Sequence, residues 1–264
     1  MTKLASLQLT PRDIYVNPSI TDLSPLSGLS ALKTLTLYNN QITDLSPLSG
    51  LSLTSLDIHD NQVSDLSPLA NLTGLSVLST SGNQISDLSP LENLTAMTNL
   101  SVRGNNITDV AGLRNMVNLT DLDLSTNQIT DLSPIQGSIH MVSLYVIQNQ
   151  IDTLAPIAGF TSLSTLNADD NHIADWAPLD ALPGLTLGTA EHQTVDVNVM
   201  AGQTFTLPVV PRTGVTCTWS VTSGQIDVAG GQATMRSPGT ATLEWTNDVA
   251  IGAVFSGTLT VTAS

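Results

Sequence analysis

The chain has 264 residues, of which 41% are apolar, 11% charged and only 3% aromatic. Seven lysines and arginines stand against 22 aspartates and glutamates, giving a net charge of −15, so no basic patch suited to nucleic acid or an anionic membrane surface can form. No apolar run reaches the roughly 18 residues of a membrane span, and the single cysteine, Cys217, excludes an internal disulfide.

The N-terminal segment, MTKLASLQLT, lacks the apolar run of a secretion signal. Leu7 and Leu9 within it begin an apolar pattern, which the stretch TPRDIYVNPS interrupts before Ile20 restores it. We interpret this region as a degenerate first repeat. We also expect the sequence to be a trimmed part of an exported protein whose signal and anchor lie outside it.

An eight-residue motif, NQITDLSP, recurs through the middle of the chain. It occurs at 40–47 and 127–134, with close variants at 61–68 and 83–90. Its asparagine recurs after 21 residues and then after every 22. A fixed period of this length predicts a solenoid in which each repeat packs on the next. The predicted structural ladder comprises Asn40, Asn61, Asn83, Asn105, Asn127, Asn149 and Asn171.

Each repeat also carries an L-x-L pair before its asparagine, such as Leu35 and Leu37. We expect this pair to form a short strand with both apolar side chains in the core. The asparagine should bond backbone groups of its turn and of the neighbouring repeat, because a buried unpaired group costs about 1–3 kcal/mol. The DLSPL segment should return the chain through one 3₁₀ turn, with Ser as N-cap and Pro at the first helical position. The repeats therefore predict a leucine-rich-repeat solenoid with short parallel strands on its concave side and 3₁₀ turns on its convex side.

An acidic residue accompanies almost every return turn. A row of carboxylates resembles a metal or catalytic ladder, but we expect each one to accept hydrogen bonds within its own turn. Thr153 takes the acidic position in one repeat. The acids are Asp22, Asp44, Asp65, Asp87, Asp109, Asp131 and Asp175.

No motif for chemistry is present. The four histidines are scattered without a zinc-binding spacing, and no nucleophile or phosphate-binding motif occurs. The segments 168–172 and 121–123 could hold Ca²⁺ weakly, but neither matches a calcium-binding loop. The sequence predicts no enzymatic activity, no metal and no cofactor.

From about Thr189 the apolar pattern changes to a period of two, after a last L-x-L pair at Leu185 and Leu187. Several short alternating strands separated by Gly and Pro predict a small immunoglobulin-like β-sandwich. We therefore expect a repeat array over residues 1–188 and a sandwich over 189–264, with Cys217 as a core side chain and not a nucleophile. The alternating positions are Val195, Val197, Val199, Val215, Cys217, Trp219, Val221, Ala241, Leu243, Trp245, Phe255, Leu259 and Val261.

The outward-facing strand positions define the expected binding surface, the concave face. Interface energetics favour tyrosine and arginine, so Tyr38, Arg103 and Tyr145 are the expected anchors. Aspartates on this face would suit a basic partner, although much of the face is Ser, Thr and Asn, as on an ordinary solvated strand. The predicted ligand-binding residues are Tyr38, Asp57, His59, Arg103, Asp121, Asp123, Tyr145, Ile147 and Asp169.

The tandem pattern NLT.L.L..NQI.DLSPL..L, followed by a sandwich ending in FSGTLTV, resembles the internalin-like surface proteins of Gram-positive bacteria. In these proteins a leucine-rich array is fused directly to an immunoglobulin-like domain. The resemblance implies a non-enzymatic adhesion or recognition module, secreted or surface-attached, that binds a protein or a glycan of a host or neighbouring cell on its concave face. The first residues depart from the helical cap with which internalins usually open.

Two other readings stay open. The 22-residue repeats also occur in phosphatase-regulating proteins, which would make the chain a cytosolic regulatory scaffold. The array could instead be a passive surface stalk. We expect a monomer with no membrane span in this chain and no nucleic-acid partner.

Overall fold

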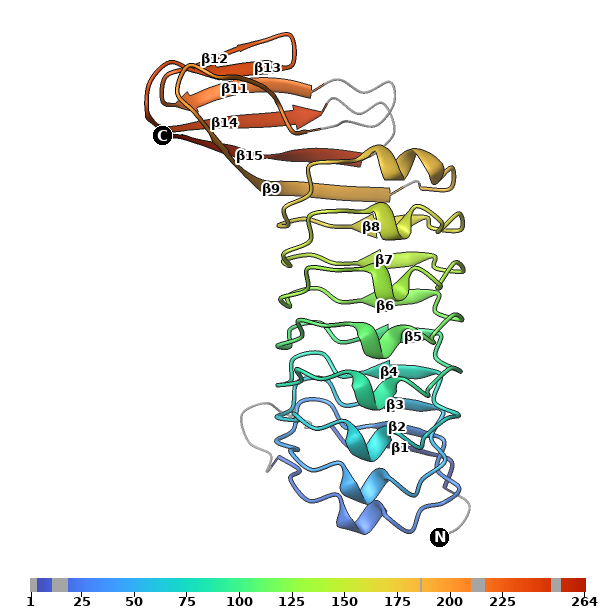
Figure 1. The fold of residues 1–264 in the computed structure, drawn as a ribbon. Helices are drawn as coiled ribbons and strands as arrows, with labels where there is room; N and C mark the ends of the chain where they lie inside the picture. The colour runs from blue at the N-terminus through green and yellow to red at the C-terminus, as the bar shows by residue number, and fades with distance from the viewer. Residues whose placement is uncertain (1–3, 11–18, 186, 210–216, 248–252) are drawn as a thin grey trace.

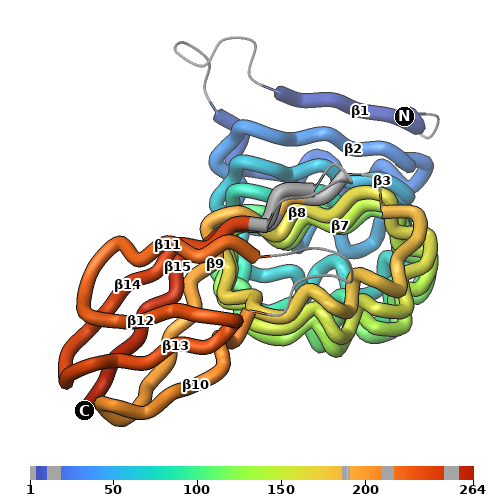
Figure 2. The backbone as a smooth tube through the Cα atoms, turned by 90° about the horizontal axis from the view of Figure 1, so that it is seen from above, coloured from blue at the N-terminus to red at the C-terminus, as the bar shows by residue number. Residues whose placement is uncertain are grey.

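The computed structural model describes residues 4–10, 19–185, 187–209, 217–247 and 253–264. Stacked coils build a solenoid, and the C-terminal strands form a separate small β-domain at its end (Figure 1). Figure 2, seen from above, shows that this domain is displaced to one side of the stacked coils.

One short strand from each coil contributes to a parallel sheet that runs the length of the solenoid. Adjacent strands pair residue for residue, so Leu35, Leu56 and Leu78 lie in one row, and all three are buried. This row confirms the strand role of the L-x-L pair. The strands are β1 (Ser6–Gln8), β2 (Thr34–Thr36), β3 (Ser55–Asp57), β4 (Val77–Ser79), β5 (Asn99–Ser101), β6 (Asp121–Asp123), β7 (Ser143–Tyr145) and β8 (Thr165–Asn167).

The return side of each coil is a single 3₁₀ turn, as predicted. The serine, however, is not the N-cap, because the cap position is the preceding leucine and carries no side-chain bond. Instead Asp44 Oδ1 accepts the Ser46 N–H at 2.8 Å and its Oδ2 accepts the Ser46 hydroxyl at 2.8 Å. The turns are η1 (Ser24–Leu26), η2 (Ser46–Leu48), η3 (Ser67–Leu69), η4 (Ser89–Leu91), η5 (Ala111–Leu113), η6 (Ser133–Ile135), η7 (Ala155–Ile157) and η8 (Ala177–Ala181).

These local bonds confirm the structural role of the acidic ladder. Hydrogen bonds from the hydroxyl and the backbone N–H of Ser133 hold the pKa of Asp131 below its usual value. At Asp22 the backbone N–H of Ser24 and then its hydroxyl lower the pKa in the same direction. In the repeat without an acid, Thr153 Oγ1 accepts the Ala155 N–H at 3.2 Å.

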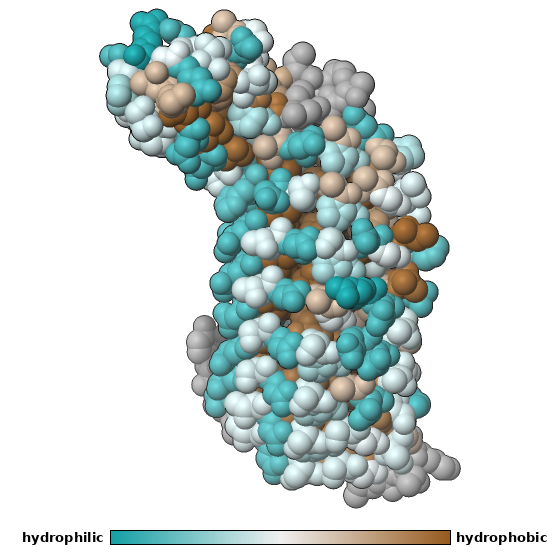
Figure 3. All heavy atoms as spheres, in the orientation of Figure 1, coloured by the Kyte–Doolittle hydropathy of each residue, from teal (hydrophilic) through white to brown (hydrophobic). Residues whose placement is uncertain are grey.

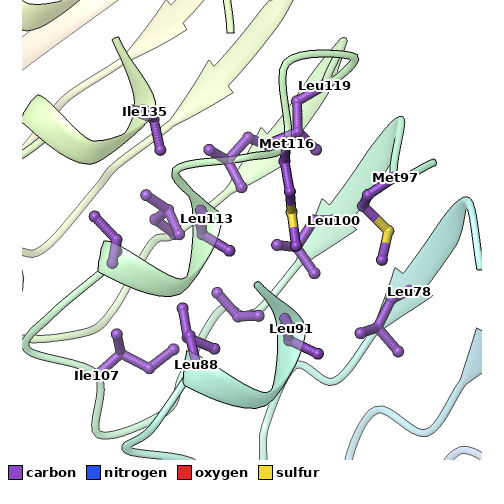
Figure 4. Close-up of a cluster of buried hydrophobic side chains, with 14 of the residues drawn as sticks. Leu78, Leu88, Leu91, Met97, Leu100, Ile107, Leu113, Met116, Leu119 and Ile135 are labelled. Carbon is purple, nitrogen blue, oxygen red and sulfur yellow. The ribbon is translucent and has the colours of Figure 1, made fainter. Parts of the chain in front are cut away.

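Leucine, isoleucine and methionine side chains from strands and turns meet inside the coils. Figure 4 shows Leu78 of β4 and Leu100 of β5 close to Leu91 of η4 and to Met97, which lies between η4 and β5 in the sequence. This cluster of buried side chains continues from Leu23 to Leu185 without a break between repeats. Each coil therefore buries its apolar faces against its two neighbours, which is the packing expected of a solenoid.

The C-terminal domain consists of two packed sheets, which is the predicted immunoglobulin-like sandwich. One sheet continues the solenoid sheet in the order β9-β15-β14-β11, and the other has the order β10-β13-β12. Leu207, Met235, Leu243 and Leu259 are buried between them. The strands are β9 (Leu187–Val199), β10 (Thr204–Thr206), β11 (Cys217–Ser223), β12 (Ile226–Ala229), β13 (Gln232–Met235), β14 (Gly239–Asn247) and β15 (Ala253–Ala263).

Strand β9 belongs to both regions. Its start pairs in parallel with β8, with Thr165 opposite Leu187 and Asn167 opposite Thr189. Along its other edge the strand pairs in parallel with β15, from Gly188 opposite Ala253 to Val199 opposite Ala263. The domain boundary expected after residue 188 thus falls inside one continuous strand, and the described part of the chain contains a single twelve-stranded sheet from β1 to β11.

The hydrophobic core crosses the same junction. Val209 and Trp245 of the sandwich belong to the buried cluster of the array, and Trp219 packs against the cores of both regions. Cys217 packs partly buried beside them, and burial raises the pKa of its thiol. These contacts are consistent with a packing role for Cys217, because a raised pKa disfavours the reactive thiolate.

One alternating position of the sandwich was predicted wrongly. Val221 is 45% exposed, because it lies near the end of β11, the outermost strand of the sheet, where the pairing register with β14 shifts. Ala241, Leu243 and Trp245 are buried as predicted. Val215 and the side chains of Leu187 and Phe255 lie outside the described residues.

Candidate binding surface

The asparagine ladder holds the coils together from inside. Asn61 Nδ2 donates to the carbonyl oxygens of Ile58 in its own turn and of Leu37 in the preceding coil, both at 3.0 Å. Its Oδ1 accepts the N–H of Ile42 from the preceding coil at 3.0 Å. The same set of bonds recurs at every predicted rung, for example at Asn105 and Asn171. Each rung therefore joins its own turn to the preceding coil.

The ladder has a further rung that sequence reasoning missed. Gln193, in β9, is fully buried and its Oε1 accepts the N–H of Ile173 at 2.9 Å. Its Nε2 donates to the carbonyl oxygens of Ala168 at 2.9 Å and Glu191 at 3.1 Å. Gln193 lies one period after Asn171, so the spacing alone could have found it despite the longer side chain.

The residue before each rung has a left-handed backbone, another feature that the sequence did not reveal. Only two of these positions, Gly82 and Gly104, are glycines, while Thr126 is β-branched and therefore strained there. Six of the eight residues are Gly, Asn, Asp or His, the types that adopt this conformation most readily, a signal that sequence reasoning did not use. Values of φ between 53° and 64° occur at Asn39, Asp60, Gly82, Gly104, Thr126, Gln148, Asp170 and His192.

With packing assigned to the ladder and the leucines, the outward side chains of β2–β8 and the residues just after them are left on the concave face. The predicted residues Asp57, Asp121, Asp123 and Tyr145 lie within β3, β6 and β7, and the others lie two residues beyond the last residue of a strand. They fall into a first cluster near β2 and β3, a hollow over β4–β7, and residues beside the junction with β9.

The first cluster joins an aromatic pair to a carboxylate. The rings of Tyr38 and His59 stack with centroids 4.5 Å apart and planes 14° apart. His59 Nδ1 lies 2.7 Å from Asp57 Oδ1, which also accepts the His59 N–H at 3.2 Å. These contacts orient the tyrosine and the imidazole before any partner arrives.

The middle of the face is hollowed, and we name this depression the central hollow. It has a volume of ≈ 310 Å³, and most of its surface is apolar. Of the predicted residues it brings together Asp121, Asp123 and Tyr145, but not Arg103 or Ile147. Figure 3 shows the side of the array that carries the return turns, where hydrophobic residues are visible between polar ones. The lining residues are Val77, Leu78, Ser79, Asn99, Leu100, Ser101, Asp121, Leu122, Asp123 and Tyr145.

Sequence reasoning missed the small and apolar residues that shape this hollow. Val77 is 40% exposed at its edge, and Ser79 and Ser101 leave the space that larger side chains would fill. Criteria based on interface anchors favour large side chains, so they pass over residues that act by being small. The pairing of Asp123 with Ser101 on one side and Tyr145 on the other could have indicated the hollow.

The remaining predicted residues have different surroundings. Asp169 is tied to the junction, because its carboxylate accepts the N–H of Glu191 at 2.8 Å and the hydroxyl of Thr189 at 3.2 Å. Arg103 is exposed and Ile147 is half-buried. Asp169 thus bonds within the protein, whereas Arg103 and Ile147 present their side chains on the face.

Within the described residues, no group of three or more His, Cys, Asp or Glu side chains could hold a metal ion. Across the same described ranges, no helix combines the length and the apolar character that a membrane crossing needs.

Comparisons with known proteins agree with this architecture. A family model described as leucine rich repeats (two copies) matches residues 13–50, 51–93 and 95–137. The internalin InlF from Listeria monocytogenes is 33% identical with a TM-score of 0.66, over 68% of this chain and 53% of its own, so the match spans about half of that relative. Internalin C2 from the same species is 31% identical with a TM-score of 0.66, over 70% of this chain and 80% of its own.

A third solved structure covers the sandwich as well. The functional domain of InlJ from Listeria monocytogenes matches 100% of this chain and 68% of its own at 20% identity with a TM-score of 0.56, a likeness in fold. A comparison with curated protein sequences finds no match. The repeats and their internalin neighbours indicate a protein-interaction module, and the chain belongs to the internalin-like leucine-rich-repeat proteins.

Proposed function

We propose that this chain is the non-enzymatic recognition module of a secreted or surface-attached bacterial protein, and that it binds a protein partner of another cell on its concave face. The observation that carries the proposal is the division of labour among its side chains. The leucines and the asparagine ladder hold the coils together. The outward side chains of β2–β8 lie outside this buried core, and they surround a hollow over β4–β7.

The expected contact residues lie along this row. Tyr38 and Tyr145 offer aromatic surface near its two ends, and Arg103 lies between them, and these residue types dominate interface energetics. Asp57, His59, Asp121, Asp123 and Ile147 complete the surface around them. Asp169 contributes by fixing the end of the face against β9, because its carboxylate is already bonded there.

The test begins with a binding screen of the chain, immobilised, against purified ectodomains of animal and bacterial cell-surface proteins and, in parallel, surface polysaccharides. Each ectodomain that binds is measured again with the triple variant Tyr38→Ala/Arg103→Ala/Tyr145→Ala. We expect at least about a tenfold loss of affinity, since truncating a few anchors removes most of the energy of an interface.

The matched control is a triple variant of exposed side chains on the opposite side, Glu92→Ala/Arg114→Ala/Gln136→Ala, which directly follow η4, η5 and η6. It should bind like the unmodified chain. Equal binding by all three proteins, or no ectodomain bound at all, would contradict the proposal and favour the passive stalk. Binding confined to polysaccharides would replace the protein partner by a glycan.

A further inference from the structure

We infer, as a refinement that rests on the proposed function, that the central hollow receives a basic side chain, arginine or lysine, from the protein partner. Carboxylates without a cation, a mostly apolar wall and an aromatic ring at one edge meet in this depression. Each of these features is met by one part of a long cationic side chain.

The two carboxylates of the hollow are only partly satisfied by the protein. Asp121 Oδ2 accepts hydrogen bonds from Asn99 Nδ2 at 2.9 Å and Thr120 Oγ1 at 2.8 Å. Asp123 Oδ1 accepts the Ser125 N–H at 2.9 Å. In the described ranges, no donor bonds the second oxygen of either carboxylate and neither forms an ion pair.

These bonds also fix where the free oxygens are. Asn99 and Thr120 hold the Asp121 carboxylate from two sides, and the backbone of the next turn holds that of Asp123. Asp121 and Asp123 are alternate residues of β6, so both project from the same side of the sheet. A partner cation would therefore meet two oriented acceptors, a geometry that favours a guanidinium or an ammonium group.

The shape of the hollow matches the rest of such a side chain. Its ≈ 310 Å³ is at the lower end of the range for ligand pockets, a size that fits a protruding side chain better than a larger ligand. The mostly apolar lining, with Val77 at its edge, can pack the methylene stem of lysine or arginine while the charged head reaches the carboxylates. Tyr145, opposite Asp123 in the next strand, offers a ring face to the same cation.

Other occupants fit less well. An acidic segment would meet the two carboxylates and a net charge of −15. A purely apolar side chain would strip water from the free carboxylate oxygens without replacing their hydrogen bonds. Arg103, two residues beyond Ser101 on β5, lies about 6–7 Å further along the strand direction and does not line the hollow.

The experiment uses two blocked heptapeptides, Gly-Ser-Gly-Arg-Gly-Ser-Gly and its counterpart with neutral citrulline in place of arginine. Backbone amide shifts of the isotopically labelled chain are followed while each peptide is added to millimolar concentration. We expect saturable shifts in β4–β7 with the arginine peptide and at least about tenfold weaker ones with citrulline. Equal shifts, or none in β4–β7, would overturn the inference.

The matched variants carry the same change of charge at two places. Asp121→Asn/Asp123→Asn should abolish the arginine-specific shifts, whereas Glu92→Gln/Asp196→Asn should keep them, because both of these acids lie outside the hollow. Thermal melts check that each variant is folded, and Asp123→Asn alone serves if the double variant is not. Loss of the shifts in both variants would overturn the inference, since it would indicate a general charge effect.

The outcome is separable from that of the proposed function. Suppose that binding of a partner requires Tyr38, Arg103 and Tyr145, but that Asp121→Asn/Asp123→Asn binds it with unchanged affinity. The concave face would then be the recognition surface, and the inference of a basic side chain in the central hollow would be wrong. Free spermidine is a final probe. Shifts in β4–β7 as strong as with the arginine peptide would assign the hollow to a small polyamine and overturn the protein source.

Discussion

The array and the sandwich satisfy their backbone hydrogen bonds in different ways. In the array, three-residue strands pair in parallel with their immediate neighbours, and one buried asparagine per coil repeats the same set of hydrogen bonds. The sandwich pairs β11, β14 and β15 antiparallel. A solenoid built of identical contacts has no inherent end, so its last coil needs a different structure to cover it. Here β9, Gln193 and Trp245 provide that cover.

The largest effect should come from breaking the ladder inside the array. Asn105→Ala would leave the buried N–H of Ile85 without a partner. It would also remove one of the two amide donors to each of the carbonyl oxygens of Thr80 and Val102, which keep Asn83 and Asn127. We expect a loss of about 2–4 kcal/mol in the free energy of unfolding, because one buried unpaired N–H costs about 1–3 kcal/mol and each further lost hydrogen bond about 0.5–1.5 kcal/mol. Urea unfolding followed by far-UV circular dichroism measures it. A loss below about 1 kcal/mol would mean that water or relaxation replaces the rung.

A somewhat smaller loss is expected at the junction. Gln193→Ala removes the same kind of bonds, to Ile173, Ala168 and Glu191. The effect should be smaller because another coil packs on only one side of this rung. The expected cost is about 1–3 kcal/mol, since only the N–H of Ile173 is left unpaired, and hydrogen exchange should show it in β8 and β15 together. Gln203→Ala, on the exposed surface of the sandwich, is the control. If the loss of protection stayed within the array, the two regions would be independent.

A gain in stability is expected at Thr80, a polar residue at the second position of an L-x-L pair. Thr80 is fully buried, and among the described residues its hydroxyl has no hydrogen-bond partner. Thr80→Val keeps the shape of the side chain and removes the unpaired hydroxyl, so the free energy of unfolding should rise by about 1–2 kcal/mol. Thermal unfolding would show it as a higher midpoint, and an unchanged or lower midpoint would indicate that the hydroxyl is bonded.

The smallest effect concerns the return turns of the array. Hydrogen bonds from Ser133 lower the pKa of Asp131 in the folded chain, so its carboxylate stabilises the fold above the unfolded pKa of about 4, and this contribution is lost as pH falls through the lower folded value. Asp131→Asn should therefore have a lower free energy of unfolding than the unmodified chain at pH 7, and the difference should disappear at pH 2–3. A stability difference that stays constant from pH 7 to pH 2 would rule out the carboxylate as its source.

Much of the array was predictable because each of its elements repeats. The spacing of the asparagines gave the ladder, the L-x-L pairs gave the buried strand row, and DLSPL gave the 3₁₀ turns. The misassigned serine cap shows the limit of this reasoning, since Ser46 donates both its N–H and its hydroxyl to Asp44, and its hydroxyl does not cap the turn. Local chemistry of this kind depends on geometry that residue types alone do not specify.

The junction and the hollow were harder to predict because they depend on contacts between unlike residues. Gln193 was missed because the motif asks for asparagine. The glutamine side chain is one methylene longer and lies in β9, yet it makes the same bond to the N–H of Ile173. The change to a period of two located the sandwich but could not indicate that β9 would pair with β8 and β15 at once. The central hollow arises where serines leave space beside Tyr145, which is a property of neighbouring coils rather than of any one repeat.

The central claim is that a shared strand and a shared core make the array and its cover one cooperative structure. Native-state hydrogen exchange of the unmodified chain tests it most directly, by comparing the amides of β8 and β9 with those of β14 and β15. We predict the same free energy of opening for all four strands, because β9 pairs with both regions and Trp245 lies in the core of the array. Opening of β14 and β15 at a clearly lower free energy, with β8 and β9 still protected, would contradict it.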